Sequence, residues 1–85
     1  MAYKIEFVPR ALKELAAIPE TDQTRIAKRI DALAENPRPP QCRKLRGAED
    51  VFRIRSGDYR VIYVVADKVV TVTVVRVGHR RDIYE

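Results

Sequence analysis

Three runs of β-branched and aromatic residues follow one another in the second half of the chain, separated only by short polar breaks. The runs cover residues 51–55, 59–65 and 69–77. Such residues favour strands because their side chains pack well on a pleated surface. Breaks this short connect antiparallel neighbours, so the pattern predicts three consecutive strands of a meander.

The first half of the chain predicts one strand and two helices. Residues 3–7 alternate apolar with charged side chains, the period of a half-buried strand. Pro9 suits the first turn of a helix and Pro19 ends that helix. We expect a second helix to begin near Thr21 or Asp22, whose side chains can cap it, and to end at Asn36-Pro37. The expected core residues of the two helices are Leu12, Leu15, Ile18, Ile26, Ile30 and Leu33.

This order of elements predicts an α+β fold, with a two-helix hairpin packed on one face of a mainly antiparallel four-stranded sheet (β-α-α-β-β-β). The length of 85 residues favours a single domain over residues 1–85. Residues 37–50 hold three of the five prolines and Gly47, so they read as one long irregular link.

The charge balance favours a polyanionic partner. The chain has 17 Lys and Arg against 12 Asp and Glu, a formal net charge of +5. Nucleic acid is the first such partner to consider, although the same charge could serve only solubility. The positions of the cations must decide between these two readings.

Cysteine usage and hydropathy point to a cytoplasmic protein. Cys42 is the one cysteine, which excludes an intramolecular disulfide and fits a reducing compartment. With one cysteine and one histidine we expect no metal site, and we expect no cofactor. The start of the chain lacks the apolar stretch of a signal peptide. Asp67, Lys68 and Arg76 interrupt the apolar run 59–77, so we expect no membrane span.

The first predicted hairpin gathers arginines on one side of the sheet. A two-residue turn at Gly57-Asp58 places Arg55 opposite Arg60, and alternation then puts Arg53 on the same side. Like charges facing each other cost roughly a few tenths of a kcal/mol, so a sheet selected only for stability would avoid them. Either these arginines form an anion-binding surface, or they are a solvated face that reaches toward acids such as Glu49 and Asp50.

The end of the last predicted strand favours the anion-binding alternative. Residues 76–84 contain three arginines together with His79 and Tyr84. In a meander this end returns toward the start of the preceding strand, so we expect Arg80 to lie near Arg60. Several guanidinium groups beside an imidazole and a phenol would suit a phosphodiester.

Several motifs in the same order resemble the RelE/ParE toxin superfamily over essentially the whole chain. They are Lys44-Leu45-Arg46-Gly47, Phe52-Arg53-Ile54-Arg55, Gly57-Asp58-Tyr59-Arg60-Val61-Ile62-Tyr63, Arg76-Val77-Gly78-His79-Arg80 and a late Tyr84. Residues 10–15 look like the first helix of the same family. The resemblance implies a toxin of a type II toxin-antitoxin system that is held by a cognate antitoxin protein and meets operator DNA only through that complex.

In the RelE branch, the resemblance implies an endoribonuclease (mRNA interferase) that enters the ribosomal A site. There a ribose 2′-hydroxyl of the messenger RNA attacks the adjacent phosphate, leaving a cyclic phosphate and a free 5′-hydroxyl. By the match to the family motifs, Arg60 and Arg53 would hold the scissile phosphate and Arg80 would contact the leaving group. Tyr84 would orient or activate the attacking hydroxyl.

The resemblance leaves the proton acceptor unassigned, because the best-studied branch has lysines at the positions of Arg53 and Arg55. Arginine hardly accepts a proton, since its pKa lies above about 12. His79, with an ordinary pKa of about 6.5, is the first candidate for this role and Tyr84 the second. The alternatives are a solvated residue past a strand end for His79 and a hydrophobic anchor for Tyr84.

Further cations are assigned to substrate binding, namely Arg55, Lys44, Arg46 and Arg81. Lys44 and Arg46 could equally brace the link. Two other functions stay open: a ParE-like toxin that poisons DNA gyrase, and a non-catalytic RNA-binding protein.

Overall fold

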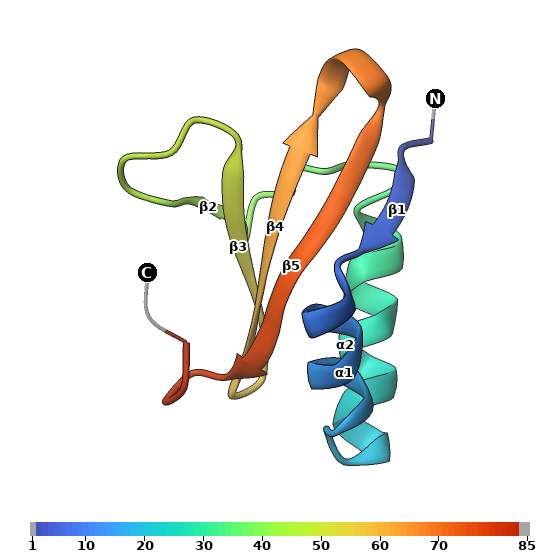
Figure 1. Cartoon of the computed structure of the whole chain (residues 1–85), viewed down its shortest axis with the longest axis vertical. Helices are drawn as coiled ribbons and strands as arrows, with labels where there is room; N and C mark the ends of the chain where they lie inside the picture. Colours follow the sequence, from blue (N-terminus) through green and yellow to red (C-terminus); the bar gives the residue numbers. More distant parts are fainter. Residues whose placement is uncertain (1, 84–85) are drawn as a thin grey trace.

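Five strands form one sheet in the order β1-β5-β4-β3-β2 in the computed structural model, which describes residues 2–83 (Figure 1). Strand β1 is parallel to β5 and all other neighbours are antiparallel. The elements are β1 Lys4–Phe7, α1 Pro9–Ala16, α2 Glu20–Ala32, β2 Arg43–Lys44, β3 Val51–Ser56, β4 Tyr59–Ala66, the 3-10 turn η1 Asp67–Val69 and β5 Thr71–His79. The predicted α+β class is therefore confirmed.

The predicted number of four strands is wrong, because β2 adds a fifth strand at the edge of the sheet. β2 has two residues, with Arg43 opposite Arg53 and Lys44 opposite Phe52 on β3. Two residues are too few to show a strand period, so the sequence offered no signal for them. The link between α2 and β3 is therefore less irregular than predicted.

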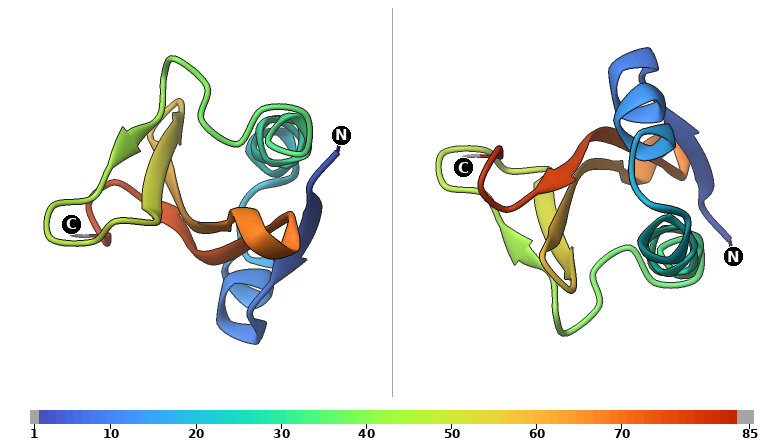
Figure 2. Two further views of the ribbon diagram at one scale, coloured as in Figure 1. Left: turned by 90° about the horizontal axis from the view of Figure 1, so that it is seen from above. Right: turned by 90° about the horizontal axis from the view of Figure 1, so that it is seen from below.

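The two helices and one face of the sheet enclose a single core. Figure 2 shows α1 and α2 apart from each other at the β1 end of the sheet, away from the β2–β3 loop. The core contains Ala11 of α1, Ile26 and Ile30 of α2, Leu33 directly after α2, and Phe52, Ile54, Val61, Tyr63, Val65, Val72, Val74 and Val77 of the strands. The strand residues in this set alternate along β3 and β4, and on β5 the register shifts by one residue between Val74 and Arg76. The opposite face of the sheet is left for other side chains.

The helix α1 begins at Pro9 as predicted, but its buried side differs from the prediction. Ala11 is fully buried, whereas Leu12 is 55% exposed, so the prediction that Leu12 belongs to the core is wrong. Leu15 packs partly against the core and Ile18 is buried. A hollow of about 450 Å³ lies between the outer sides of α1 and α2, with Leu12 in its wall.

The helix α2 begins one residue before the predicted start, and no side chain caps it. Pro19 is the N-cap residue, and its carbonyl oxygen accepts a hydrogen bond of 2.8 Å from the Gln23 N–H. The prediction that Thr21 or Asp22 caps this helix is therefore wrong. Glu20 and Asp22 instead place negative charge in the first turn, where it interacts favourably with the helix dipole.

Residue Glu14 explains why α1 lies along β5. Beyond Val74, β5 continues past its pairing with β1, which leaves backbone groups at an edge. The Glu14 carboxylate accepts a hydrogen bond of 2.9 Å from the Val77 N–H and lies 3.1 Å from Arg76 Nε. A charged group on the edge also discourages pairing with another chain.

A cluster of polar residues fixes the start of the link after α2. Arg38 donates two hydrogen bonds to the Asp67 carboxylate, and the Tyr3 hydroxyl donates a third. These bonds hold the pKa of Asp67 below its usual value. Nearby, the buried Tyr63 hydroxyl donates to the Pro37 carbonyl oxygen at 2.8 Å, and burial raises the pKa of this tyrosine. The link is thereby tied to β1, β4 and η1.

Two further findings concern membranes and metals. In the part of the chain that the structure describes, no helix has the length and apolar character to cross a membrane. Among residues 2–83, no three His, Cys, Asp or Glu side chains gather in a way that could hold a metal ion.

Candidate functional site

The hairpin between β3 and β4 has the predicted register. Ser56 lies opposite Tyr59, and Arg55 lies directly opposite Arg60. Gly57 in the turn has a φ of +60°, which a residue without a side chain adopts at low cost. The tight turn thus brings two guanidinium-bearing residues into a facing pair.

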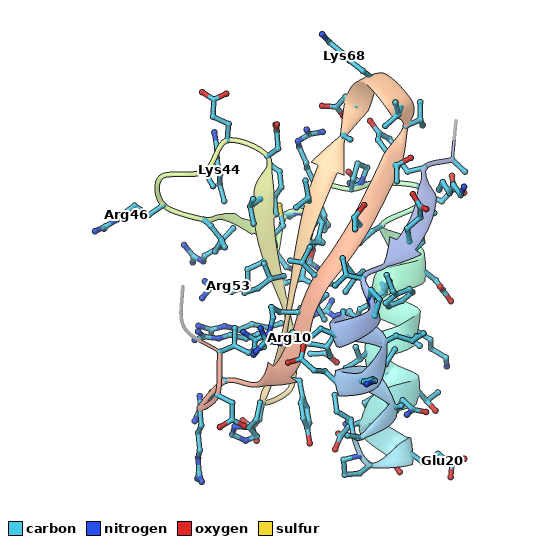
Figure 3. The ribbon with its side chains drawn as sticks, in the orientation of Figure 1. Arg10, Glu20, Lys44, Arg46, Arg53 and Lys68 are labelled. Carbon is cyan, nitrogen blue, oxygen red and sulfur yellow. The ribbon has the colours of Figure 1, made fainter. Side chains whose placement is uncertain are left out.

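Four arginines lie on the face of the sheet opposite the helices, and we call Arg43, Arg53, Arg55 and Arg60 the arginine face. Arg53 is only 8% exposed. Burial, followed by the charges of Arg60, Arg55 and Arg43, lowers the pKa of Arg53. Figure 3 shows Arg53 projecting from the sheet on the side away from the helices. Positive charge is therefore concentrated in a partly desolvated place.

Arg43 was not among the predicted site residues. It lies directly opposite Arg53 on the edge strand β2, and facing residues of an antiparallel pair point to the same side. Gln41, Arg43, Arg53 and Arg55 line a hollow of about 410 Å³. The sequence signal for Arg43 was weak, because its strand is too short to reveal which way its side chains point.

Arg80 lies at the end of the sheet where β4 begins, and Arg60 is the second residue of β4. The backbone N–H of Arg80 donates to the Asp58 carbonyl oxygen at 2.8 Å, in the turn between β3 and β4. The facing pair on this side is Arg60 and Gly78, two residues before Arg80. A side chain on Gly78 would meet Ile83 at 3.0 Å, so the chain after β5 folds back over this face. The Arg80 backbone thus lies beside the turn that precedes Arg60, and Arg80 Nε lies 4.0 Å from the Asp58 carboxylate.

His79 lies on the other side of the sheet from the arginine face. It pairs with Tyr59, whose ring meets the imidazole edge-on with centroids 5.7 Å apart, and Tyr59 packs against the core. The Arg81 N–H donates to His79 Nδ1 at 3.2 Å. The structure therefore does not bring His79 to the predicted arginine cluster, because successive residues of a strand point to opposite faces.

The remaining predicted residues are more scattered. Lys44 faces Phe52, which is a core residue, so it points away from Arg53. Arg46 is exposed in the β2–β3 loop, and Figure 3 shows it pointing away from Arg53. Arg81 is exposed beyond β5, and Tyr84 lies outside the described residues. The structure thus gathers Arg53, Arg55 and Arg60, with Arg80 at one end.

Such a surface is chemically suited to a phosphate group. Guanidinium groups donate several hydrogen bonds in a fixed fork that matches phosphate oxygens, and their charge persists in a desolvated place. An approaching anion would also relieve the repulsion among the four arginines. Cationic donors of this kind could stabilise charge that develops on a phosphate during its transfer.

The fold is the one expected for the RelE/ParE toxin superfamily, and comparison with known proteins confirms this class. The family model described as "ParE toxin of type II toxin-antitoxin system, parDE" matches residues 5–84. The chain belongs to the RelE/ParE superfamily of type II toxins.

Within that superfamily the chain is similar to proteins named RelE. It is 40% identical over 82 residues to the mRNA interferase toxin RelE of Escherichia coli K12, covering 94% of this chain and 85% of that protein. The crystal structure of isolated E. coli RelE has a TM-score of 0.83 at 36% identity, covering 92% of this chain and 84% of that one. The RelE-RelB complex of Pyrococcus horikoshii gives 0.83 at 30% identity, covering 98% of this chain and 100% of the matched chain.

Proposed function

We propose that this toxin is a ribosome-dependent endoribonuclease that cuts messenger RNA in the ribosomal A site, in the cytoplasm. The observation that carries the proposal is the facing pair Arg55 and Arg60 beside the nearly buried Arg53. This arrangement costs stability and suits a phosphodiester. The similar E. coli protein is named an mRNA interferase, which supports the same substrate class.

In the proposed reaction, a ribose 2′-hydroxyl attacks the adjacent phosphorus and the bond to the 5′-oxygen of the next nucleotide breaks. The products are a cyclic phosphate and a 5′-hydroxyl. Arg60 and Arg53 would hold the phosphate and stabilise its developing charge, and Arg80 would contact the leaving oxygen. Because His79 lies on the other face, we assign proton transfer to Tyr84, on the family resemblance alone.

The proposed partners are the ribosome with its message and a cognate antitoxin protein. Relatives with the same fold have been solved as complexes of RelE with RelB, from P. horikoshii and from E. coli. We propose that this chain is likewise neutralised by an antitoxin, and that it meets operator DNA only within that complex.

The proposal is tested by replacing Arg60 and Arg80 with alanine. Each variant should lower the single-turnover cleavage rate on programmed ribosomes by roughly 100- to 1000-fold, the usual cost of losing one charge-stabilising donor. Cells that express either variant without antitoxin should grow. Arg25→Ala is the matched control, because it removes an equal charge from an exposed position on α2.

A gyrase poison is the second candidate, since the matching family model describes ParE toxins. Mapping of message ends after induction separates the two functions. New 5′ ends within coding regions support the nuclease. Growth arrest without such ends, or continued killing by both alanine variants, contradicts it.

A further inference from the structure

We propose that Arg43 and Gln41, together with Arg53 and Arg55, form a second phosphate-binding subsite, which holds a phosphate of the same RNA strand next to the one that is cut. This inference rests on the proposed function and deepens it. It assigns a substrate-binding role to β2, the strand that the sequence did not reveal.

The subsite is a real hollow with a cationic wall. Its volume is about 410 Å³, within the range of roughly 300–1,000 Å³ that small-ligand sites occupy. Three of its four lining residues are arginines. Arg43 and Arg55 are exposed, so an incoming strand can reach their guanidinium groups, while the nearly buried Arg53 forms the inner wall.

The hollow extends from the place proposed for cleavage toward β2, and Arg53 borders both. It opens on the β2 side of β3, whereas Arg60 lies on β4 and Arg80 lies beyond β5. Neighbouring strands lie about 4.8 Å apart, so β2 and β4 are separated by roughly 10 Å. A polyanion that crosses the strands from Arg80 toward Arg43 would therefore present one phosphate at Arg60 and a further phosphate at the hollow.

The residues also define the class of ligand. The Arg43 guanidinium can grip a phosphate with two parallel hydrogen bonds. Gln41 adds an amide that both donates and accepts, as a ribose hydroxyl or a base edge requires. A nucleotide unit of a single strand offers this combination of groups. Arg55, which faces Arg60 and also lines the hollow, joins the two positions.

The test compares Arg43→Ala with wild type and with Arg25→Ala in single-turnover cleavage on ribosomes programmed with a defined message. We expect Arg43→Ala to raise the protein concentration for half-maximal rate by roughly 10- to 100-fold, the effect of losing a charged hydrogen bond, with the maximal rate kept within about twofold. Arg25→Ala should change neither value. Neither variant should lower the melting temperature below that of wild type, because both side chains are exposed.

A second arm locates the phosphate. A set of messages is used, and each message carries one uncharged methylphosphonate at a different position near the cut. A 2′-deoxyribose directly before the methylphosphonate keeps it stable. At one position, the methylphosphonate should raise the half-maximal concentration of wild type by the same factor as Arg43→Ala does. The same message should not raise the half-maximal concentration of Arg43→Ala any further. The subsite is refuted if Arg43→Ala behaves like Arg25→Ala. It is also refuted if the effect of Arg43→Ala adds to the effect of the methylphosphonate at every position. In both cases the proposed cleavage activity is unaffected. If wild type cuts no message, the proposed function fails and the subsite fails with it.

Discussion

At the scale of single residues, arginines serve two different purposes in this fold. Arg38 is paired with Asp67, Arg76 with Glu14, and the Arg29 guanidinium donates to the Arg55 carbonyl oxygen at 2.7 Å. These contacts tie elements together. Arg53 lies close to other arginines, and its pKa is lowered first by burial and then by the charges of Arg60, Arg55 and Arg43. The contacts of Arg38, Arg76 and Arg29 stabilise the fold, and the arginine face concentrates positive charge that suits an anion.

The pairing of Asp67 predicts a specific loss of stability in acid. Its pKa is lowered by hydrogen bonds from Arg38 and Tyr3. A carboxylate with a lowered pKa stabilises the fold fully above its unfolded-state pKa, near 3.8, and loses this contribution as the pH falls through its lower folded-state pKa. Below about pH 4, the melting temperature of wild type should fall more steeply than that of Asp67→Asn.

Thermal melts between about pH 2 and pH 6 measure this difference. Glu35→Gln serves as the control, because it removes an exposed carboxylate from outside the Asp67 cluster. Parallel melting curves for wild type and Asp67→Asn across the acid range would show that the cluster contributes nothing.

At the scale of elements, the two helices differ in how they use apolar residues. The α2 stripe of Ile26 and Ile30 is buried as its period predicts. In α1 the small Ala11 is buried instead of Leu12, because α1 lies close along β5 and Glu14 bonds its edge. A periodic stripe identifies a helix well, but which residue meets the core depends on what the helix packs against.

This difference predicts unequal costs of truncation. Ile30→Ala removes a side chain that is 1% exposed and should lower the free energy of unfolding by about 2–5 kcal/mol. Leu12→Ala removes one that is 55% exposed and should cost less than about 1 kcal/mol. Urea denaturation measures both values. A larger loss for Leu12→Ala than for Ile30→Ala would contradict the placement of α1.

At the scale of the whole molecule, the two faces of the sheet have separate tasks. One face and both helices form the core, and the other face carries concentrated positive charge on a molecule of net charge +5. Self-repulsion of this kind destabilises the compact state, and salt screens it. The fold thus accepts an electrostatic cost on the face that we propose binds RNA.

The electrostatic repulsion on the arginine face predicts that sodium chloride stabilises the protein. Raising the salt concentration from about 0.02 M to about 0.5 M should raise the melting temperature by roughly 2–5 °C, because the arginine face is screened. Arg55→Gln removes one member of that face and should show a smaller rise in the same scan. A melting temperature that falls with salt would mean that the ion pairs, rather than the arginine face, dominate the electrostatics.

The sequence by itself determined the order and type of the longer elements, the register of the β3–β4 hairpin and the common side of Arg53, Arg55 and Arg60. Each follows from local chemistry, namely the alternation of side chains and a tight turn at Gly57. Only the tertiary structure decided the rest. β2 exists because Arg43 and Lys44 pair with β3 across the loop that joins them, and Leu12 is exposed because of how α1 meets β5. Arg43 joins the arginine face and His79 leaves it because strand pairing, not sequence spacing, fixes the side on which each residue lies.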